Sequence, residues 1–203
     1  MGGMQSPWQS VLAFWFGELD EQGLCAPETV ERWWRKDPQF DATLRSRFSL
    51  EHAAIARGER EAWLADAHGR LAYVVVLDQF SRNMFRGTPG MFASDERALA
   101  AAVEGLGIGA DRELRLHERV FLYMPLMHSE RLDVQERGVA TFAALAEAAP
   151  AAAKETFDGY VKYAGAHRDI VARFERFPHR NAILGRSTTP EEEAFLKQPG
   201  SSF

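Results

Sequence analysis

Residues 6–17 read Ser-Pro-Trp-Gln-Ser-Val-Leu-Ala-Phe-Trp-Phe-Gly, and this stretch decides the fold class. Ser6 is a preferred helix N-cap, and Pro7 fits the first helical turn, where its missing N–H is no loss. Apolar residues then recur at the spacing of one helical face, and Gly17 is a typical helix stop. The stretch therefore predicts an amphipathic helix between Pro7 and Gly17.

Similar start, stop and periodicity signals recur along the rest of the chain. They predict a short helix from Pro27, a helix from Pro38 to Gly58, one over residues 61–86 with a break near Gly69, one capped by Asp95 and ended by glycines 105, 107 and 109, helices over 112–124, 131–148 and 151–176, and a last helix through Leu196 that begins at the capping box Thr189-Pro190-Glu191-Glu192. No window alternates with the two-residue period of a strand.

The predicted fold class is therefore all-α, as one domain over residues 1–203. Short connections favour antiparallel neighbours, so we expect about eight helices in antiparallel pairs. With 46% hydrophobic and 26% charged residues, the composition is that of an ordinary globular protein.

The charge and cysteine content exclude several functional classes. A formal net charge of -5 argues against a surface built for nucleic acid or for an anionic membrane. Cys25 is the only cysteine, so no internal disulfide can form, and the N-terminus has no secretion-signal pattern. No apolar run is long enough to span a bilayer. These features predict a cytoplasmic protein with no membrane and no nucleic-acid partner.

Polar residues interrupt the apolar pattern of residues 74–86. Asp78 and Arg82 are four residues apart on one predicted helical face and can pair, while Gln79 and Asn83 lie on the adjacent strip. One interpretation is an ion pair with amides that tie helices together. The other is that Arg82, Asn83 or Arg86 points into a pocket.

A second polar group follows Pro125, which should kink or end its helix. If the helix continues, His128 shares a face with His117, Phe121 and Met124. His128 and Glu130 form a weak metal-binding pattern, and no nucleophile elbow surrounds Ser129. Ser129 or Glu130 is most simply read as a cap for the next helix.

The third polar group spans residues 167–181, which crowd two His, four Arg, an Asn and an Asp among apolar residues. A predicted inward face comprises Tyr160, Tyr163, His167, Ile170 and Phe174. His179, Arg180 and Asn181 follow in a non-helical turn after Pro178, which should carry them off the helix axis. Buried arginines need carboxylate or phosphate partners. The alternatives are an internal network and a ligand site.

Four motifs carry a resemblance to a known family: Leu77-Asp78-Gln79-Phe80-Ser81-Arg82-Asn83, Tyr123-x-Pro125-x-x-His128-Ser129-Glu130, Arg176-Phe177-Pro178-His179-Arg180-Asn181 and Leu184-Gly185-Arg186. The chain resembles, from about Val11 to Leu196, the bacterial family called domain of unknown function 924. The resemblance implies an all-helical fold of the tetratricopeptide-like superfamily, a right-handed helical array. It implies no activity and no catalytic residues. Where the family pattern has Gly, this chain has Glu175.

Two functional hypotheses follow. In the first, the polar groups converge on a pocket for a small anionic molecule: Arg82, Arg176 and Arg180 hold a phosphate or carboxylate, Asn83 and Asn181 orient it, and His128, His167 and His179 are candidate catalytic residues. Asp78, Gln79 and Glu130 are structural partners, and neither a metal nor a cofactor is expected. In the second, the protein is an interaction module for a peptide or protein. The number of inward polar residues favours the pocket.

Overall fold

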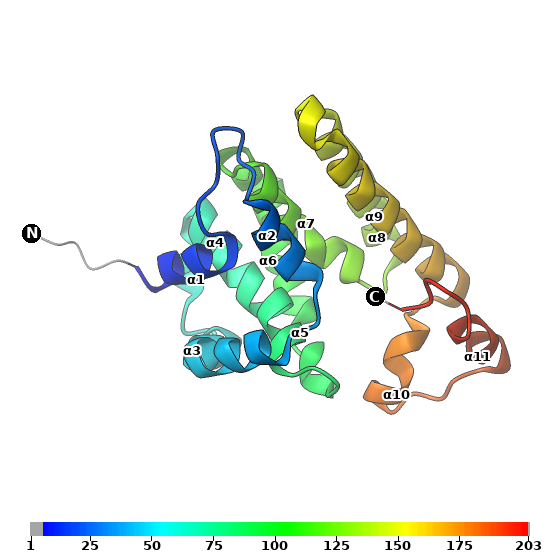
Figure 1. Ribbon diagram of the computed structural model, residues 1–203. Helices are drawn as coiled ribbons and strands as arrows, with labels where there is room; N and C mark the ends of the chain where they lie inside the picture. The colour runs from blue at the N-terminus through cyan, green and yellow to red at the C-terminus, as the bar shows by residue number, and fades with distance from the viewer. Residues whose placement is uncertain (1–5, 203) are drawn as a thin grey trace, which may run out of the picture.

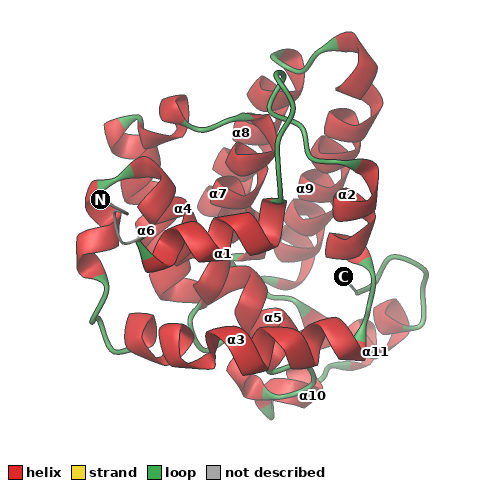
Figure 2. Ribbon diagram, turned by 60° about the vertical axis from the view of Figure 1, so that its left-hand side comes forward, coloured by secondary structure: helices red, strands yellow, loops and turns green. Residues whose placement is uncertain are grey.

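The computed structural model describes residues 6–202, and every long element in this range is a helix (Figures 1 and 2). The α-helices are α1 Pro7–Phe16, α2 Pro27–Trp34, α3 Pro38–Ala56, α4 Ala67–Val75, α5 Ser81–Met84, α6 Asp95–Ile108, α7 Leu116–His128, α8 Leu132–Glu147, α9 Lys154–Phe174, α10 Asn181–Leu184 and α11 Pro190–Leu196. Within the described range the only β-type pairing is one isolated bridge between Leu19 and Cys25. The all-α prediction is confirmed.

Helix starts that depend on a local cap lie where the sequence predicts them. The Asp37 carboxylate accepts hydrogen bonds from the backbone N–H groups of Gln39 and Phe40 at 2.9 and 3.1 Å, and so caps α3. At α11, the Thr189 hydroxyl accepts from the Glu192 N–H at 3.2 Å, and the Glu192 carboxylate accepts from the Thr189 N–H at 2.7 Å. This is the predicted capping box.

Residues 61–86 do not form the long helix that periodicity predicts. A 3₁₀ turn, Glu61–Ala65, comes first, and Asp66 then caps α4 by accepting from the N–H groups of His68 and Gly69. The break therefore lies at Asp66, and Gly69 instead allows the Trp63 carbonyl to approach the backbone closely. After α4 the chain widens into a π-helix, Val76–Phe80, before α5.

The prediction for α6 is wrong at its start and only partly confirmed at its end. Ser94 occupies the N-cap position, and Asp95 is the first helical residue, with its carboxylate turned to arginines of other elements. Gly105 lies inside the helix, where the Arg70 side chain packs against it. Only Gly109, in the left-handed conformation at φ 75°, ends the helix.

Two later helices also differ from their predicted bounds. Helix α7 continues through Pro125 to His128, as one sequence alternative allowed. Helix α9 ends at Phe174, followed by Glu175 at φ 56°, the left-handed region that favours glycine. The predicted inward face of α9 is wrong at Tyr163, which is 60% exposed.

Aromatic side chains from α1, α2, α7 and the π-helix form the centre of the core. They include Trp15, Phe16, Trp33, Phe80 and Phe121, all buried. Helices α8 and α9 form a hairpin beside this body. The chain then turns into α10 and α11, which lie below the hairpin in Figure 1. Only a small second cluster, Ile170, Val171 and Phe177 with Phe174 and Phe195, packs the end of the chain.

Across residues 6–202, no helix combines the length and apolar character needed to cross a bilayer. The single domain over residues 1–203 stays a prediction, and its first five residues and Phe203 lie outside the described part. The tetratricopeptide-like array also stays a prediction.

Candidate functional site

The π-helix presents Asp78 to the interior, where its side chain is 1% exposed. One turn later, the Arg82 guanidinium lies 2.9 Å from Asp78 Oδ1 and also donates to the Asp78 carbonyl at 3.0 Å. The structure thus contains the ion pair expected from the four-residue spacing. π-Turns inside α-helices occur often at functional sites, which makes the surroundings of Asp78 the place to look for one.

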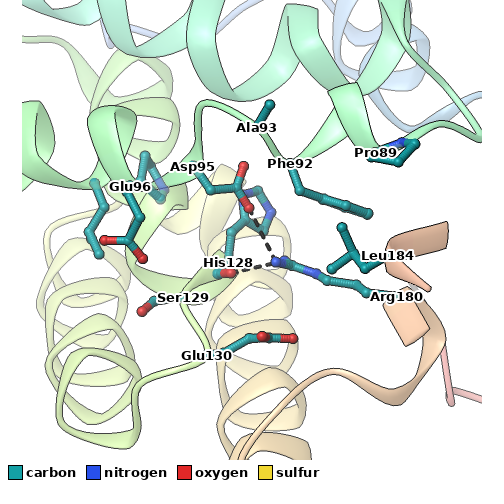
Figure 3. Close-up of a pocket in the computed structure, with 12 residues that line it drawn as sticks. Pro89, Phe92, Ala93, Asp95, Glu96, His128, Ser129, Glu130, Arg180 and Leu184 are labelled. Carbon is teal, nitrogen blue, oxygen red and sulfur yellow. Dashed lines mark hydrogen bonds and ion pairs between the residues drawn. The ribbon is translucent and has the colours of Figure 1, made fainter. Parts of the chain in front are cut away.

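Asp95 joins this pair to the end of the chain. Its carboxylate accepts two bonds from Arg82, at 3.0 and 3.1 Å, and one from Arg180 Nη1 at 3.2 Å. Arg180 Nη2 donates to the His128 carbonyl at 2.9 Å, so the side chain bridges α6 and α7 (Figure 3). Nothing in the sequence marks Asp95 as a site residue, because helix capping already explains an acidic residue at the start of a helix.

His128 completes the cluster from the last residue of α7. Its Nδ1 lies 2.7 Å from Asp78 Oδ1. Burial alone would raise the pKa of the Asp78 carboxyl, but the charge of Arg82 and the hydrogen bonds of His128 and Gln79 outweigh it and lower the pKa. Burial, together with the charge of Arg82, lowers the pKa of His128. At neutral pH an ionised carboxylate therefore faces a neutral imidazole.

A pocket of about 410 Å³ opens beside this cluster (Figure 3). Its lining combines apolar residues, Pro89, Phe92, Leu99, Pro125 and Leu184, with polar ones, Asp95, His128, Ser129, Glu130 and Arg180. Glu96 lies at the exposed rim. The lining comes from the turn before α6, from the end of α7 and from the segment after α9, so the fold gathers three distant stretches of sequence.

Arg180 is the arginine among the described lining residues, and its side chain is 8% exposed. Its guanidinium carbon lies 4.6 Å from the ring centres of both Phe92 and Phe177, so two aromatic faces enclose it. Its Nε has no acceptor among the described residues. Burial, and then the charge of Arg82, lower the pKa of Arg180 to about 10, so its surroundings compensate its charge incompletely.

His167 and His179, the other two candidate catalytic residues, lie behind the pocket. The ring centres of His167 and His128 are 6.1 Å apart, and His167 Nδ1 is 2.8 Å from the Tyr163 carbonyl. Burial lowers the pKa of His167 to about 3 and that of His179 to about 4. The ring centre of His179 is 5.6 Å from that of Phe177. Neither histidine is among the residues that line the pocket.

Of the five predicted ligand-binding residues only Arg180 lines the pocket. Arg82 pairs with Asp78 and Asp95, and the other three also make internal contacts. Asn83 donates to the Gln79 carbonyl at 2.8 Å and accepts from Arg86 at 2.7 Å. Arg176 forms a two-bond pair with Glu192 at 2.6 and 2.8 Å. Asn181 is fully buried, and its side-chain oxygen accepts from Arg186 Nε at 3.1 Å. Gln79 donates to Asp78 Oδ2 at 2.5 Å, as a structural partner would.

Glu130 ties the end of the chain to the α7–α8 turn. Its carboxylate accepts two bonds from Arg186, at 2.7 and 2.9 Å, and one from the Phe177 N–H at 2.8 Å. The prediction that Ser129 or Glu130 caps α8 is wrong for Glu130, whose carboxylate is committed elsewhere. Ser129 accepts from the Arg131 N–H at 3.2 Å, but Arg131 holds the cap position.

A metal centre has no counterpart in the described residues, where no group of three or more His, Cys, Asp or Glu side chains is placed to hold an ion. The polar groups of the pocket are acids and bases paired with one another. The arrangement can bind a small molecule against Arg180 and exchange protons through His128.

Comparison with known proteins places the chain in a family. A structure from Agrobacterium tumefaciens, described as protein of unknown function ATU0120, is similar to this chain with a TM-score of 0.78 and 37% identity, over 94% of this chain and 96% of that chain. Comparison with curated proteins gave no match. Residues 11–200 match the family of bacterial proteins of unknown function DUF924, as the four motifs predicted. The chain belongs to the DUF924 family.

Proposed function

We propose that the pocket binds a small molecule with a carboxylate or phosphate group and an apolar portion. The observation that carries this proposal is the position of Arg180. Its guanidinium lines the pocket, donates to a single carboxylate oxygen that Arg82 also uses, and leaves Nε without an acceptor. A buried cation with so little compensation is stabilised by an added negative charge.

The apolar portion of the ligand is supported by the apolar residues of the lining. They include Phe92, Leu99, Pro125 and Leu184, and ligand pockets of this size commonly combine an apolar lining with a few converging polar groups. The acidic residues do not oppose an anion equally. Arg186 neutralises Glu130 through two bonds, and Glu96 lies exposed at the rim, where solvent screens its charge.

A matched set of small probes tests the charge preference. Phenylacetate and phenyl phosphate should raise the melting temperature of the protein at millimolar concentration, whereas phenylacetamide and phenethylamine, with the same ring and no negative charge, should not. A larger shift with phenethylamine would overturn the proposal, because it would show that Glu96 and Glu130 dominate the pocket.

Two variants locate the response. Leu184→Trp should fill the pocket from its partly exposed wall and abolish the shift without touching the ion pairs. Arg180→Ala should abolish it by removing the cation. Arg176→Ala is the matched control, because it removes an arginine–carboxylate pair that lies outside the pocket. The proposal is wrong if all three variants respond like the wild type.

The second candidate function is a protein-interaction module. Trp34 and Tyr163 are 52% and 60% exposed on α2 and α9, and the Trp34 ring lies 6.1 Å from that of Tyr160, one turn before Tyr163. Large exposed aromatics are common at interfaces. Two results together would favour this candidate. No anionic probe would change the melting temperature, and Trp34→Ser would leave folding intact but release a partner peptide that cross-linking had identified.

A further inference from the structure

We infer that His128 is a general base, which takes a proton from a molecule or a water in the pocket, and that Asp78 is the positioning residue that holds its ring. This inference rests on the proposed pocket but not on the charge of the ligand. It assigns a catalytic step to residues for which the family resemblance implies none.

The hydrogen bond between the two side chains fixes which ring nitrogen is basic. An ionised carboxylate can only accept, so the 2.7 Å contact places the proton on Nδ1 of His128. In the neutral ring Nε2 then carries the lone pair. Among the described residues, Nε2 of His128 has no hydrogen-bond partner, and His128 lines the pocket. The same logic applies wherever a carboxylate orients a catalytic histidine.

Asp78 is itself held rigidly in the orientation this requires. Arg82 contacts the same oxygen at 2.9 Å, Gln79 donates to the other oxygen at 2.5 Å, and the π-helix fixes the backbone between them. A side chain with both oxygens bonded cannot rotate away from the imidazole. The cost of burying this carboxylate is considerable, and fold stability alone does not require it.

Burial and the charge of Arg82 lower the pKa of His128, while the charges of Asp78 and Asp95 oppose that shift. The groups that face His128 from the surrounding elements are Asp78 of the π-helix, Arg82 of α5, Asp95 of α6, His167 of α9, and His179 and Arg180 of the turn after α9. In the step itself an O–H bond of the bound molecule or water breaks, its electron pair stays on the oxygen as an alkoxide or hydroxide, and the Nε2 lone pair forms the new N–H bond. Asp78 stabilises the resulting imidazolium, which returns the proton to the product or to solvent.

The tautomer of His128 is the first test, and it needs no variant. Long-range ¹H–¹⁵N spectra of histidine-labelled wild-type protein at pH 7 should show the Nδ1–H form for His128. An Nε2–H form would overturn the inference. Asp78→Leu should lose the preference for Nδ1–H, whereas Asp95→Asn, which removes another carboxylate partner of Arg82, should keep it.

Reactivity is the second test. Diethyl pyrocarbonate acylates an unprotonated, accessible imidazole nitrogen, so it should label His128 at pH 7, and Leu184→Trp should reduce that labelling at least tenfold. His68, whose side chain is 38% exposed and lies outside the pocket, is the internal reference. Labelling of His68 without His128 would show that Nε2 does not face the pocket, and would overturn the inference.

The two proposals can fail separately. If His128 is labelled but phenylacetate gives no thermal shift, the inference of a general base stands and the proposal of an anion-binding pocket fails. If phenylacetate raises the melting temperature but His128 carries its proton on Nε2, the proposal of an anion-binding pocket stands and the inference of a general base fails.

Discussion

Two regions of this molecule, the aromatic body built by α1 to α7 and the segment after α9, are held in the fold by different forces. The N-terminal body packs aromatic rings, among them Phe121, whose ring centre lies 4.5 Å from that of Trp33 and 5.4 Å from that of Trp15. The segment after α9 buries a much smaller apolar cluster and is attached through Arg180, Arg186 and their carboxylate partners. Apolar burial is insensitive to pH, whereas ion pairs and buried histidines respond to it.

The comparison shows where the protein can be changed without unfolding. The body should unfold as a unit, and the C-terminal segment should open first when its charges are disturbed. The pocket lies on the boundary between the two, because Arg180 and Leu184 come from the segment and the other lining residues from the rest of the fold.

The largest expected effect contrasts two buried phenylalanines, Phe121 and Phe177, both 0% exposed. Phe121→Ala should lower the free energy of unfolding by about 4 kcal/mol, because it leaves a cavity in the aromatic core. Phe177→Ala should instead open the segment after α9, with faster amide exchange over residues 176–196 and a smaller change in global unfolding. Chemical denaturation and hydrogen exchange measure the two effects. Equal global losses would remove the distinction between the two regions.

Acid should weaken the region around His167. The folded pKa of His167, about 3, lies below the unfolded value of about 6.5, so the unfolded state binds the extra proton. The contribution of the neutral, buried His167 to the free energy of unfolding is complete above pH 6.5 and is lost as the pH falls toward 3. Between pH 7 and pH 5 the loss is roughly 2 kcal/mol. His167→Gln should flatten the pH dependence of denaturation by that amount. His68→Gln, at an exposed position, should leave the curve unchanged.

Glu130→Gln tests the electrostatic attachment directly. The variant keeps an oxygen for the Phe177 N–H but loses the charge that pairs with Arg186, so the segment should lose about 1–2 kcal/mol of protection against amide exchange. Glu191→Gln is the control, because its pair with Arg173 is exposed at 65% and 49% and should contribute almost nothing. Similar results for the two variants would count against attachment by charge.

Glu175→Gly should have the smallest effect, and a stabilising one. Glu175 adopts φ 56°, where a side chain is strained, and replacement by Gly should raise the unfolding free energy by about 1 kcal/mol. Gly185, at φ 66°, is the mirror control: Gly185→Ala should destabilise by a similar amount. A loss of stability in Glu175→Gly would mean that the Glu175 side chain makes a contact worth more than the strain.

The parts of the fold that the sequence predicts correctly depend on neighbours within a few residues. The caps at Asp37 and Thr189 act on N–H groups two or three positions ahead, so they are visible as short patterns. The resemblance to the family led us to expect Gly at position 175, and the left-handed φ of Glu175 is the conformation that favours Gly.

The site could be predicted only in part, because its contacts join distant residues. Arg82, His128 and Arg180 were identified as unusual polar residues, but nothing in their spacing showed that Asp95 would join Arg82 and Arg180 across 13 and 85 positions. The π-helix was equally invisible, since residues 76–80 have ordinary helical composition. Arg176 and Asn181 are of residue types that often bind ligands. Only the structure shows that their hydrogen-bonding groups are used by Glu192 and Arg186.

The wide sequence separation of the site has a consequence for how the chain folds. The Asp78–His128 contact closes 50 residues of chain, Arg186–Glu130 closes 56, and Arg180–Asp95 closes 85. Closing long loops is slow and comes after local helices have formed. During synthesis Arg180 and Leu184 also leave the ribosome after every other residue that lines the pocket. The pocket is therefore assembled at the final stage of folding, and a ligand that requires Arg180 distinguishes completely folded chains from those in which only the aromatic body has formed.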